Sequence, residues 1–304
     1  MDPKIIGAFG VLCLCSISSS SVMMMGSGEE KPVVPDTTTD DSGSDDSGAD
    51  DSEATTTPTP PAATTPTPPA ATTPTPPPPP TGWPHVSWSK IPGGLKQVDI
   101  DGNTVCGVNS ADNIYCKDDL TSGNWKKLPG ALKHVSVSGG KLYGVNSADE
   151  IYYSPNTNGE WSKISGGLKQ VDIDGNTVCG VNSADNIYCK DDLTSGNWKK
   201  LPGALKHVSV SGGKLYGVNS ADQIYYSPNT NGEWSKIPGG LKQVDIDGNT
   251  VCGVNSADNI YCKDDLTSGN WKKLPGALKY VSVTGGNKLY GANSADDIYF
   301  GTKP

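Results

Sequence analysis

The chain has 304 residues, enough for one or two domains, and its formal net charge is −9 at pH 7. All 24 basic side chains are lysines, whereas arginine is the side chain that most often reads guanine and clamps phosphate. Residues 29–53 hold ten Asp or Glu and one Lys, and the chain from Trp83 onward holds 22 Asp or Glu and 22 Lys. Without arginine or a basic stripe, nucleic acid is not an expected partner.

Residues 1–25 combine a short charged start, an apolar run from Ile5 to Ile17 and four consecutive serines. This order is typical of a cleaved secretory signal peptide. The 21 residues from Ile5 to Met25 carry no charge, and that length also permits an uncleaved membrane anchor. Both interpretations stay open. In either case we expect a protein that is secreted or displayed at a cell or particle surface, with a membrane contact only through this segment.

Two biased segments follow the leader. Residues 26–54 are mostly Asp, Ser, Gly and Thr, and so few apolar side chains predict a disordered acidic linker. Residues 55–82 repeat the text TTPTPPAA, which predicts an extended Thr/Pro-rich stalk. In a secreted chain its threonines are candidates for O-glycosylation, and an unmodified linker is the alternative. A stalk of this kind suggests a domain that is held out for display.

Residues 83–304 contain six copies of one unit of about 36 residues. The copies begin at tryptophans spaced 37, 36, 37, 36 and 37 residues apart, which are Trp88, Trp125, Trp161, Trp198, Trp234 and Trp271. The first, third and fifth copies are nearly identical, and the other three form a looser second type. The pattern therefore has a pseudo-threefold repeat of 73 residues.

Each unit alternates polar and apolar residues over four short segments separated by turn signals. In the first unit these segments are 95–101, 104–109, 113–117 and 124–130, with Pro129-Gly130 ending the last. Four short strands per unit predict one blade of a propeller, so the expected fold is an all-β, six-bladed β-propeller of four-stranded blades. The chain starts on an outer strand and ends three strands into its last unit. We therefore expect the N-terminal and C-terminal strands to pair and close the ring.

Six of the eight cysteines lie in pairs, ten residues apart, inside the repeats. In a hairpin centred on Ala111, Cys106 and Cys116 face each other, and the second type of unit places Tyr143 and Tyr153 at the same positions. We expect disulfides and an oxidising compartment. Free buried thiols are the alternative, and the spacing disfavours zinc. The expected bridges are Cys106–Cys116, Cys179–Cys189 and Cys252–Cys262.

The sequence contains no Ser/His/Asp set, no nucleophile elbow and no phosphate loop, so we expect no enzyme. The acidic pair Asp118-Asp119 recurs twice and formally fits a glycosidase pair, but one active site copied three times is not typical of enzymes. Asp99-x-Asp101-Gly102-Asn103 resembles the start of a calcium loop. It lacks the closing glutamate, so a hairpin turn is favoured over a calcium site, and no other cofactor or metal is expected.

A binding surface fits the repeats better. Sugars are recognised by aromatic faces and by short polar side chains, and each unit supplies one Trp and one Asn-Ser-Ala-Asp turn. Packing of the Trp between blades and plain turn chemistry are the alternatives. The candidate ligand-binding residues are Trp88, Trp125, Trp161, Trp198, Trp234, Trp271, Asn109, Asp112, Asn182, Asp185, Asn255 and Asp258.

The units W-x-K-I-x-G-x-L-K-Q-V-D-I-D-G and V-x-G-V-N-x-x-D-x-I-Y resemble tectonin repeats, which occur in fish-egg lectins, a horseshoe-crab lectin and slime-mould tectonins. The resemblance covers about Trp88 to Gly301. It implies a closed six-bladed propeller and non-enzymatic binding of glycans such as N-acetylglucosamine, lipopolysaccharide or methylated sugars. We therefore expect a stalked, multivalent lectin with three equivalent sites alternating with three variant ones. A protein-binding propeller that serves adhesion or structure is the alternative.

Overall fold

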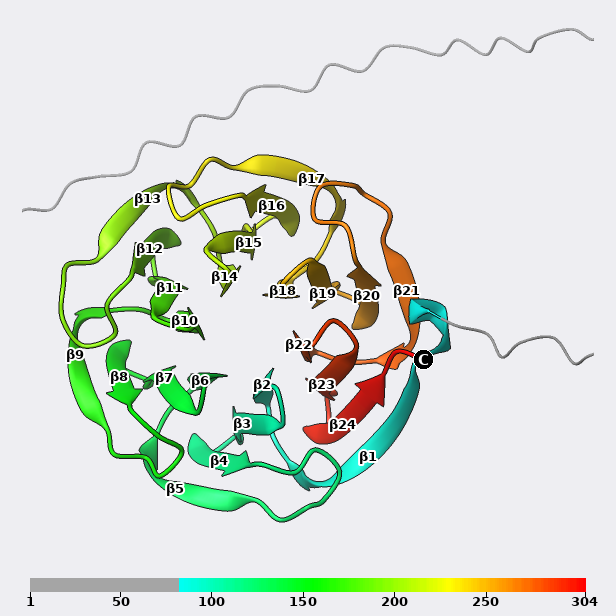
Figure 1. Cartoon of the computed structure of the whole chain (residues 1–304), viewed down its shortest axis with the longest axis horizontal. Helices are drawn as coiled ribbons and strands as arrows, with labels where there is room; N and C mark the ends of the chain where they lie inside the picture. Colours follow the sequence, from blue (N-terminus) through cyan, green and yellow to red (C-terminus); the bar gives the residue numbers. More distant parts are fainter. Residues whose placement is uncertain (1–81) are drawn as a thin grey trace, which may run out of the picture. The chain divides into compact units, whose positions relative to one another are not determined.

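The structure, a computed structural model, describes residues 82–304. The expected leader, acidic linker and stalk lie outside the described residues except for Gly82. The described part forms six four-stranded antiparallel sheets arranged as a ring around a central axis (Figure 1). The predicted six-bladed β-propeller is confirmed. Apart from a 3-10 helix at Trp83–His85, the elements are all strands, and no helix within residues 82–304 is long and apolar enough to cross a bilayer.

Each blade runs from an inner strand beside the axis to an outer strand on the circumference (Figure 1). The first three blades contain, from inside to outside, β2 (Gln97–Asp101), β3 (Thr104–Val108), β4 (Asn113–Lys117) and β5 (Lys126–Ala131); β6 (His134–Ser138), β7 (Lys141–Val145), β8 (Glu150–Ser154) and β9 (Ser162–Gly167); β10 (Gln170–Asp174), β11 (Thr177–Val181), β12 (Asn186–Lys190) and β13 (Lys199–Ala204). The last three contain β14 (His207–Ser211), β15 (Lys214–Val218), β16 (Gln223–Ser227) and β17 (Ser235–Gly240); β18 (Gln243–Asp247), β19 (Thr250–Val254), β20 (Asn259–Lys263) and β21 (Lys272–Ala277); β22 (Tyr280–Thr284), β23 (Lys288–Ala292), β24 (Asp297–Thr302) and β1 (Ser87–Gly94).

The hydrophobic core lies between neighbouring blades. One cluster, for example, packs Ile114 and Leu128 of the first blade against Val135 and Leu142 of the second. Within the first blade, Gly107 in β3 permits a close approach to β2. A Cβ atom at Gly107 would lie 2.5 Å from the Gln97 carbonyl oxygen, well inside van der Waals contact.

The register of the middle hairpins is the one that the sequence predicts. Cys106 pairs with Cys116 across β3 and β4. Their Cα atoms are 4.1 Å apart and a disulfide joins them, as it does Cys179–Cys189 and Cys252–Cys262. In the alternate blades the same positions hold Tyr143 and Tyr153, whose ring centroids are 5.5 Å apart. The three predicted disulfides are confirmed, and they support an extracellular setting.

The ring is closed by the two ends of the described chain. β1 pairs antiparallel with β24, with Ile91 opposite Ile298, so the first strand completes the last blade as predicted. Trp83, just before β1, is buried and its indole Nε1 donates a hydrogen bond to Asp264 Oδ2 over 3.0 Å. Lys303 donates to the same carboxylate oxygen over 2.6 Å. These contacts fasten both ends to the fifth blade.

One detail of the outer strands differs from expectation. Pro129 and Gly130 were expected to end β5, yet the strand continues to Ala131 through a bulge between the pairs Ile114↔Leu128 and Asn113↔Ala131. Gly130 takes a φ of 89°, which glycine adopts without a steric cost. Trp161, the tryptophan of the next unit, packs over Gly130 at this bulge.

Candidate ligand-binding site

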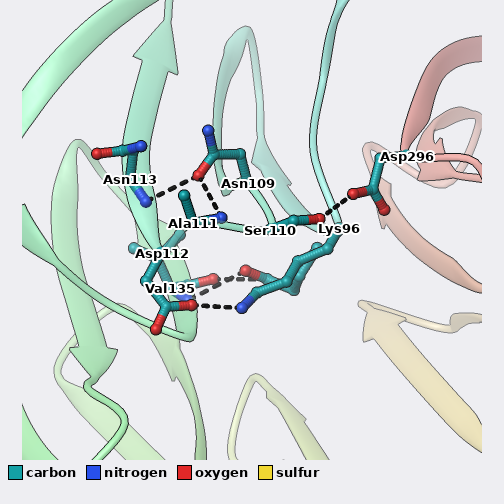
Figure 2. Close-up of polar contacts among 9 residues, drawn as sticks. Lys96, Asn109, Ser110, Ala111, Asp112, Asn113, Val135 and Asp296 are labelled. Atoms are coloured by element: carbon teal, nitrogen blue, oxygen red, sulfur yellow. Dashed lines mark hydrogen bonds and ion pairs between the residues drawn. The ribbon is translucent and has the colours of Figure 1, made fainter.

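The Asn-Ser-Ala-Asp turn joins the second and third strands of every blade (Figure 2). In the first blade, Asn109 Oδ1 accepts hydrogen bonds from the backbone N–H groups of Ala111 (3.1 Å) and Asn113 (2.9 Å). Asp112 has a φ of 61°, a left-handed conformation that Asp tolerates better than most residues. Its carboxylate forms an ion pair with the Lys96 ammonium. The turn is thus held together by its own side chains.

The three predicted aspartates of these turns all make such structural contacts. Each pairs with the lysine that precedes the inner strand of its own blade; the pairs are Lys96–Asp112, Lys169–Asp185 and Lys242–Asp258. Neither Asp112 nor Asp185 lines the hollows described next. The geometry gives these carboxylates a role in fixing the turn.

The six repeated tryptophans pack between blades. Trp125 donates a hydrogen bond from its indole Nε1 to the Pro92 carbonyl oxygen of the neighbouring outer strand, over 2.9 Å. The equivalent bonds measure 2.8–2.9 Å and are made by Trp88 to Pro275, Trp161 to Pro129, Trp198 to Ser165, Trp234 to Pro202 and Trp271 to Pro238. Each indole also covers a glycine of positive φ, such as Gly93 beneath Trp125. The indoles remain half-buried, so part of each ring stays exposed.

A hollow opens beside these tryptophans, between two blades. The one at Trp125 has a volume of about 260 Å³ and brings Trp125, Tyr115 and Asn109 of the first blade against Gly94 and Ile298 of the last. Equivalent hollows of about 330, 300 and 190 Å³ lie beside Trp198, Trp161 and Trp88. The same residue types surround Trp234 and Trp271. The structure therefore brings the predicted tryptophans and asparagines together, and it adds a tyrosine that sequence reasoning missed.

These inter-blade hollows fall into two classes. The odd hollows contain Asn109 with Trp125 and Asn182 with Trp198, and the even hollows contain Asn146 with Trp161 and Asn293 with Trp88. By the repeat, Asn255 with Trp271 corresponds to the odd class and Asn219 with Trp234 to the even class. In the even hollow at Asn146, the Nδ2 amide donates to Glu150 Oε2 over 2.8 Å, and the Tyr152 hydroxyl donates to the same oxygen over 3.0 Å. In the odd hollow at Asn109, Figure 2 shows no such bond between the Asn109 amide nitrogen and the side chain of Asn113, the residue equivalent to Glu150.

A buried lysine lies against the tryptophan of each odd hollow. Lys117 Nζ is 4.7 Å from the Trp125 ring centroid and donates to the Ser122 carbonyl. Lys190 and Lys263 stand in the same way over Trp198 and Trp271. Burial lowers the pKa of Lys117 and of Lys263 to about 8. This cation–π contact fixes the indole that faces the hollow.

The inner strands place three carboxylates on the propeller axis. Asp99, Asp172 and Asp245 each bring one oxygen to within 4.8 Å of the others. Asp99 accepts hydrogen bonds from the Val137 N–H (2.7 Å) and the Ser282 hydroxyl (2.8 Å), and the other two have equivalent partners. Burial raises the pKa of all three carboxyls, and that of Asp172 reaches about 7.

The proposed calcium loop forms a tight turn. Gly102 has a φ of 60° between Asp101 and Asn103, and Asp101 accepts a hydrogen bond from the Gly139 N–H of the next blade over 2.6 Å. Asp99 turns to the axis instead. The carboxylates of Asp99 and Asp101 therefore point to different places and do not surround a common point within their own loop. This geometry agrees with a hairpin turn.

The repeated acidic pairs make structural hydrogen bonds. Asp118 Oδ1 accepts a hydrogen bond from the Thr104 hydroxyl over 2.8 Å, and Asp119 Oδ1 accepts from the Thr121 N–H over 2.8 Å. These bonds lower the pKa of Asp119, chiefly through the Thr121 N–H. A general acid needs a raised pKa, so Asp119 is unsuited to that role.

Comparisons with known proteins agree with this architecture. The model of the Tectonin domain matches residues 82–195 and 167–304. A search of curated proteins finds no match. Among solved structures, a nidogen–laminin complex is similar with a TM-score of 0.50 and 16% identity, covering 60% of this chain and 82% of that chain. The likeness shows the propeller fold alone.

Two further propellers are similar at comparable levels. YCF48 from Cyanidioschyzon merolae has a TM-score of 0.49 and 14% identity over 71% of this chain and 98% of its own. The Pan2 WD40 domain of Neurospora crassa has a TM-score of 0.49 and 13% identity over 69% of this chain and 75% of its own. The two Tectonin matches together span residues 82–304, more than half of the chain. With six blades of the expected repeat, the chain belongs to the Tectonin domain family.

Proposed function

We propose that the protein is a multivalent carbohydrate-binding lectin, and that its sugar sites are the inter-blade hollows. The observation that carries the proposal is the meeting of an indole, a tyrosine and a turn asparagine in one concave site, as at Trp125, Tyr115 and Asn109. Aromatic faces pack against the apolar side of a sugar ring, and the amide and hydroxyl are placed to bond its hydroxyls.

The size of the hollows also supports this proposal. Their volumes of about 190–330 Å³ lie below or at the lower end of the range of small-molecule sites, which begins near about 300 Å³. Such a hollow suits one sugar ring better than an extended oligosaccharide. A single site of this size is expected to bind weakly, with a Kd on the order of 1 mM.

Repetition offsets weak single sites. Equivalent hollows around one ring can engage a repetitive surface simultaneously, and linked binding raises avidity by roughly 10² to 10⁴. The targets would be glycans on cell or microbial surfaces. The three disulfides suit an extracellular setting, and the N-terminal segments are proposed to export the propeller and hold it on a stalk.

A glycan array tests the proposal with the full chain and a triple variant, Asn109→Asp, Asn182→Asp and Asn255→Asp. Aspartate keeps the side-chain oxygen that accepts from the turn N–H groups, and it replaces the amide donor by an acceptor. We expect glycan signals from the wild type that the variant loses.

The matched control is Asn103→Asp, Asn176→Asp and Asn249→Asp. It introduces the same charge at the turns on the opposite ends of the strands, where each asparagine oxygen already accepts from a lysine. This control should keep the wild-type signals. A wild type that binds no glycan, but retains a protein partner through the same hollows, would replace the lectin by the protein-binding adhesion propeller.

A further inference from the structure

The hollows at Asn109, Asn146, Asn182 and Asn293 have nearly the same lining, but the residue that follows each Asn-Ser-Ala-Asp turn differs between odd and even blades. The odd blades carry Asn113, Asn186 and Asn259 at this position, and the even blades carry Glu150, Gln223 and Asp297. The position begins the third strand of each blade, next to the turn asparagine and two residues before the hollow's tyrosine. A residue that varies beside hollows of nearly the same lining can make the hollows differ in binding.

In the even hollows this residue bonds the hollow's own polar groups. Glu150 Oε2 accepts from Asn146 Nδ2 and from the Tyr152 hydroxyl. Gln223 Oε1 accepts from Asn219 over 3.0 Å and from Tyr225 over 3.1 Å.

Asp297 lies in the third even hollow. It accepts from Asn293 Nδ2 over a longer 3.4 Å, and it also pairs with Lys90 at 2.8 Å. The longer bond fits its side chain, which is one methylene shorter than that of Glu150. Of the three even hollows, this one is held least tightly.

In the odd hollows the same groups are free. Within residues 82–304, Asn109 Nδ2 and the Tyr115 hydroxyl have no hydrogen-bond partner, and their counterparts at Asn182, Tyr188, Asn255 and Tyr261 have none either. Asn113 contributes its backbone N–H to the turn, and its side chain makes no bond to Asn109 or Tyr115. The odd hollows therefore present an amide donor and a phenol beside the indole.

We propose that the residue after the turn selects which hollows bind sugar: asparagine leaves the odd hollows open, Glu150 and Gln223 close two even hollows by holding both donors, and Asp297 closes the third by holding the Asn293 amide. This inference rests on the proposed function and adds to it a stoichiometry of three sites. The sugar taken by an odd hollow carries a hydrogen-bond acceptor, such as a carbonyl, ether or hydroxyl oxygen, facing the Asn109 amide. A sugar entering an even hollow must first break those internal bonds, which weakens binding by about tenfold or more.

The test is a titration followed by the ¹⁵N–¹H signals of the tryptophan indoles in the full chain. Each hollow contains one indole, so the signals report the sites separately, and single Trp→Phe variants assign them. The probe is N-acetylglucosamine, or the monosaccharide with the strongest array signal if that is a different one. The signals of Trp125, Trp198 and Trp271 should move together. The signals of Trp161, Trp234 and Trp88 should move only at sugar concentrations at least about tenfold higher.

Two variants of one position make the test specific. Glu150→Asn converts an even hollow into the odd type, and Trp161 should then respond with a Kd within about threefold of that for Trp125. Glu150→Gln keeps the acceptor, as Gln223 does naturally, and should leave Trp161 unresponsive. The turn persists in both, because Asn146 Oδ1 accepts from backbone N–H groups. The reciprocal change, Asn113→Glu, should silence Trp125.

The outcomes separate this inference from the proposed function. If all six indoles respond alike in the wild type, or if Glu150→Asn leaves Trp161 unresponsive while Trp125 moves, the selection by this residue is wrong and the hollows remain sugar sites. If no indole responds to a sugar that the array detects, the protein is still a lectin, but the hollows are not its sites, and the selection by the residue after the turn is overturned with them.

Discussion

Removing one carboxylate from the axis should stabilise the propeller at neutral pH. Asp99, Asp172 and Asp245 meet there, shielded from water, and burial raises the pKa of Asp172 from 3.8 to about 7. A group whose pKa is raised on folding binds more protons in the folded state between those two values. The free energy of unfolding therefore falls as the pH rises from about 4 to about 7. Because asparagine does not ionise, we expect Asp172→Asn to abolish the part of this fall in the free energy of unfolding that is due to Asp172.

The magnitude follows from the shift. About 3 pKa units at 1.36 kcal/mol each give about 4 kcal/mol. Asparagine can still accept from the Val210 N–H, to which Asp172 is bonded at 2.7 Å. Relative to the wild type, Asp172→Asn should therefore gain about 4 kcal/mol between pH 4 and pH 8. Burial lowers the pKa of His134 and His207, which acts with the opposite sign below pH 6.5. Both histidines are present in both proteins, so their effect cancels in the difference.

The assay is urea unfolding followed by tryptophan fluorescence at several pH values from 4 to 8. Asp222→Asn is the control of opposite sign, because the hydrogen bond from Lys206 lowers the pKa of Asp222. It should be less stable than the wild type throughout this range. A stability difference between Asp172→Asn and the wild type that is independent of pH, or larger at pH 4 than at pH 8, would refute the account of the axis.

Three further changes test the packing, each by urea unfolding against the wild type. Replacing Cys106 and Cys116 by alanine should cost about 2–3 kcal/mol under oxidising conditions, and a variant as stable as the wild type would show that the bridge is absent in solution. Tyr143→Phe removes the buried hydroxyl that donates to the Leu193 carbonyl and should cost about 1 kcal/mol; no loss would mean that the bond is not made. Gly107→Ala places a methyl group 2.5 Å from the Gln97 carbonyl oxygen and should cost about 1–3 kcal/mol, whereas an unchanged midpoint would contradict the close approach of β2 and β3.

The hairpins could be predicted because their signals are local. A strand repeats every two residues, so fixing the turn at Ala111 also fixes Cys106 opposite Cys116, as the structure has it. The incomplete first and last units likewise predicted the pairing of β1 with β24. These inferences needed only spacing and the avoidance of an open sheet edge.

The hollows and the axis could not be predicted in the same way, because they depend on how blades pack. Trp125 meets Gly93 and Pro92 of the last blade only after the ring closes. Asp99 and Asp172 are equivalent residues, 73 positions and two blades apart. Their carboxylates meet only because the inner strands of the closed ring all face one axis. In the sequence, Asp99 alternates with Val98 and Ile100 and therefore looks like any polar residue on the exposed side of a strand.

The residue after each turn is visible in the sequence, but its role cannot be inferred from its neighbours in the chain. The substitution of Asn113 by Glu150, Gln223 or Asp297 in the equivalent positions is visible in the repeats. Its consequence appears only when Tyr152 and Asn146 are seen to share Glu150. Differences between otherwise identical repeats are therefore a useful signal for binding residues.

The central claim is that sugars bind between the blades. The most direct measurement is a crystal structure of the protein soaked with the monosaccharide that gives the strongest array signal. The account predicts sugar density in the hollows beside Trp125, Trp198 and Trp271, with the sugar within hydrogen-bond distance of Asn109, Asn182 and Asn255. Sugar bound on another surface, with these three hollows empty, would contradict it.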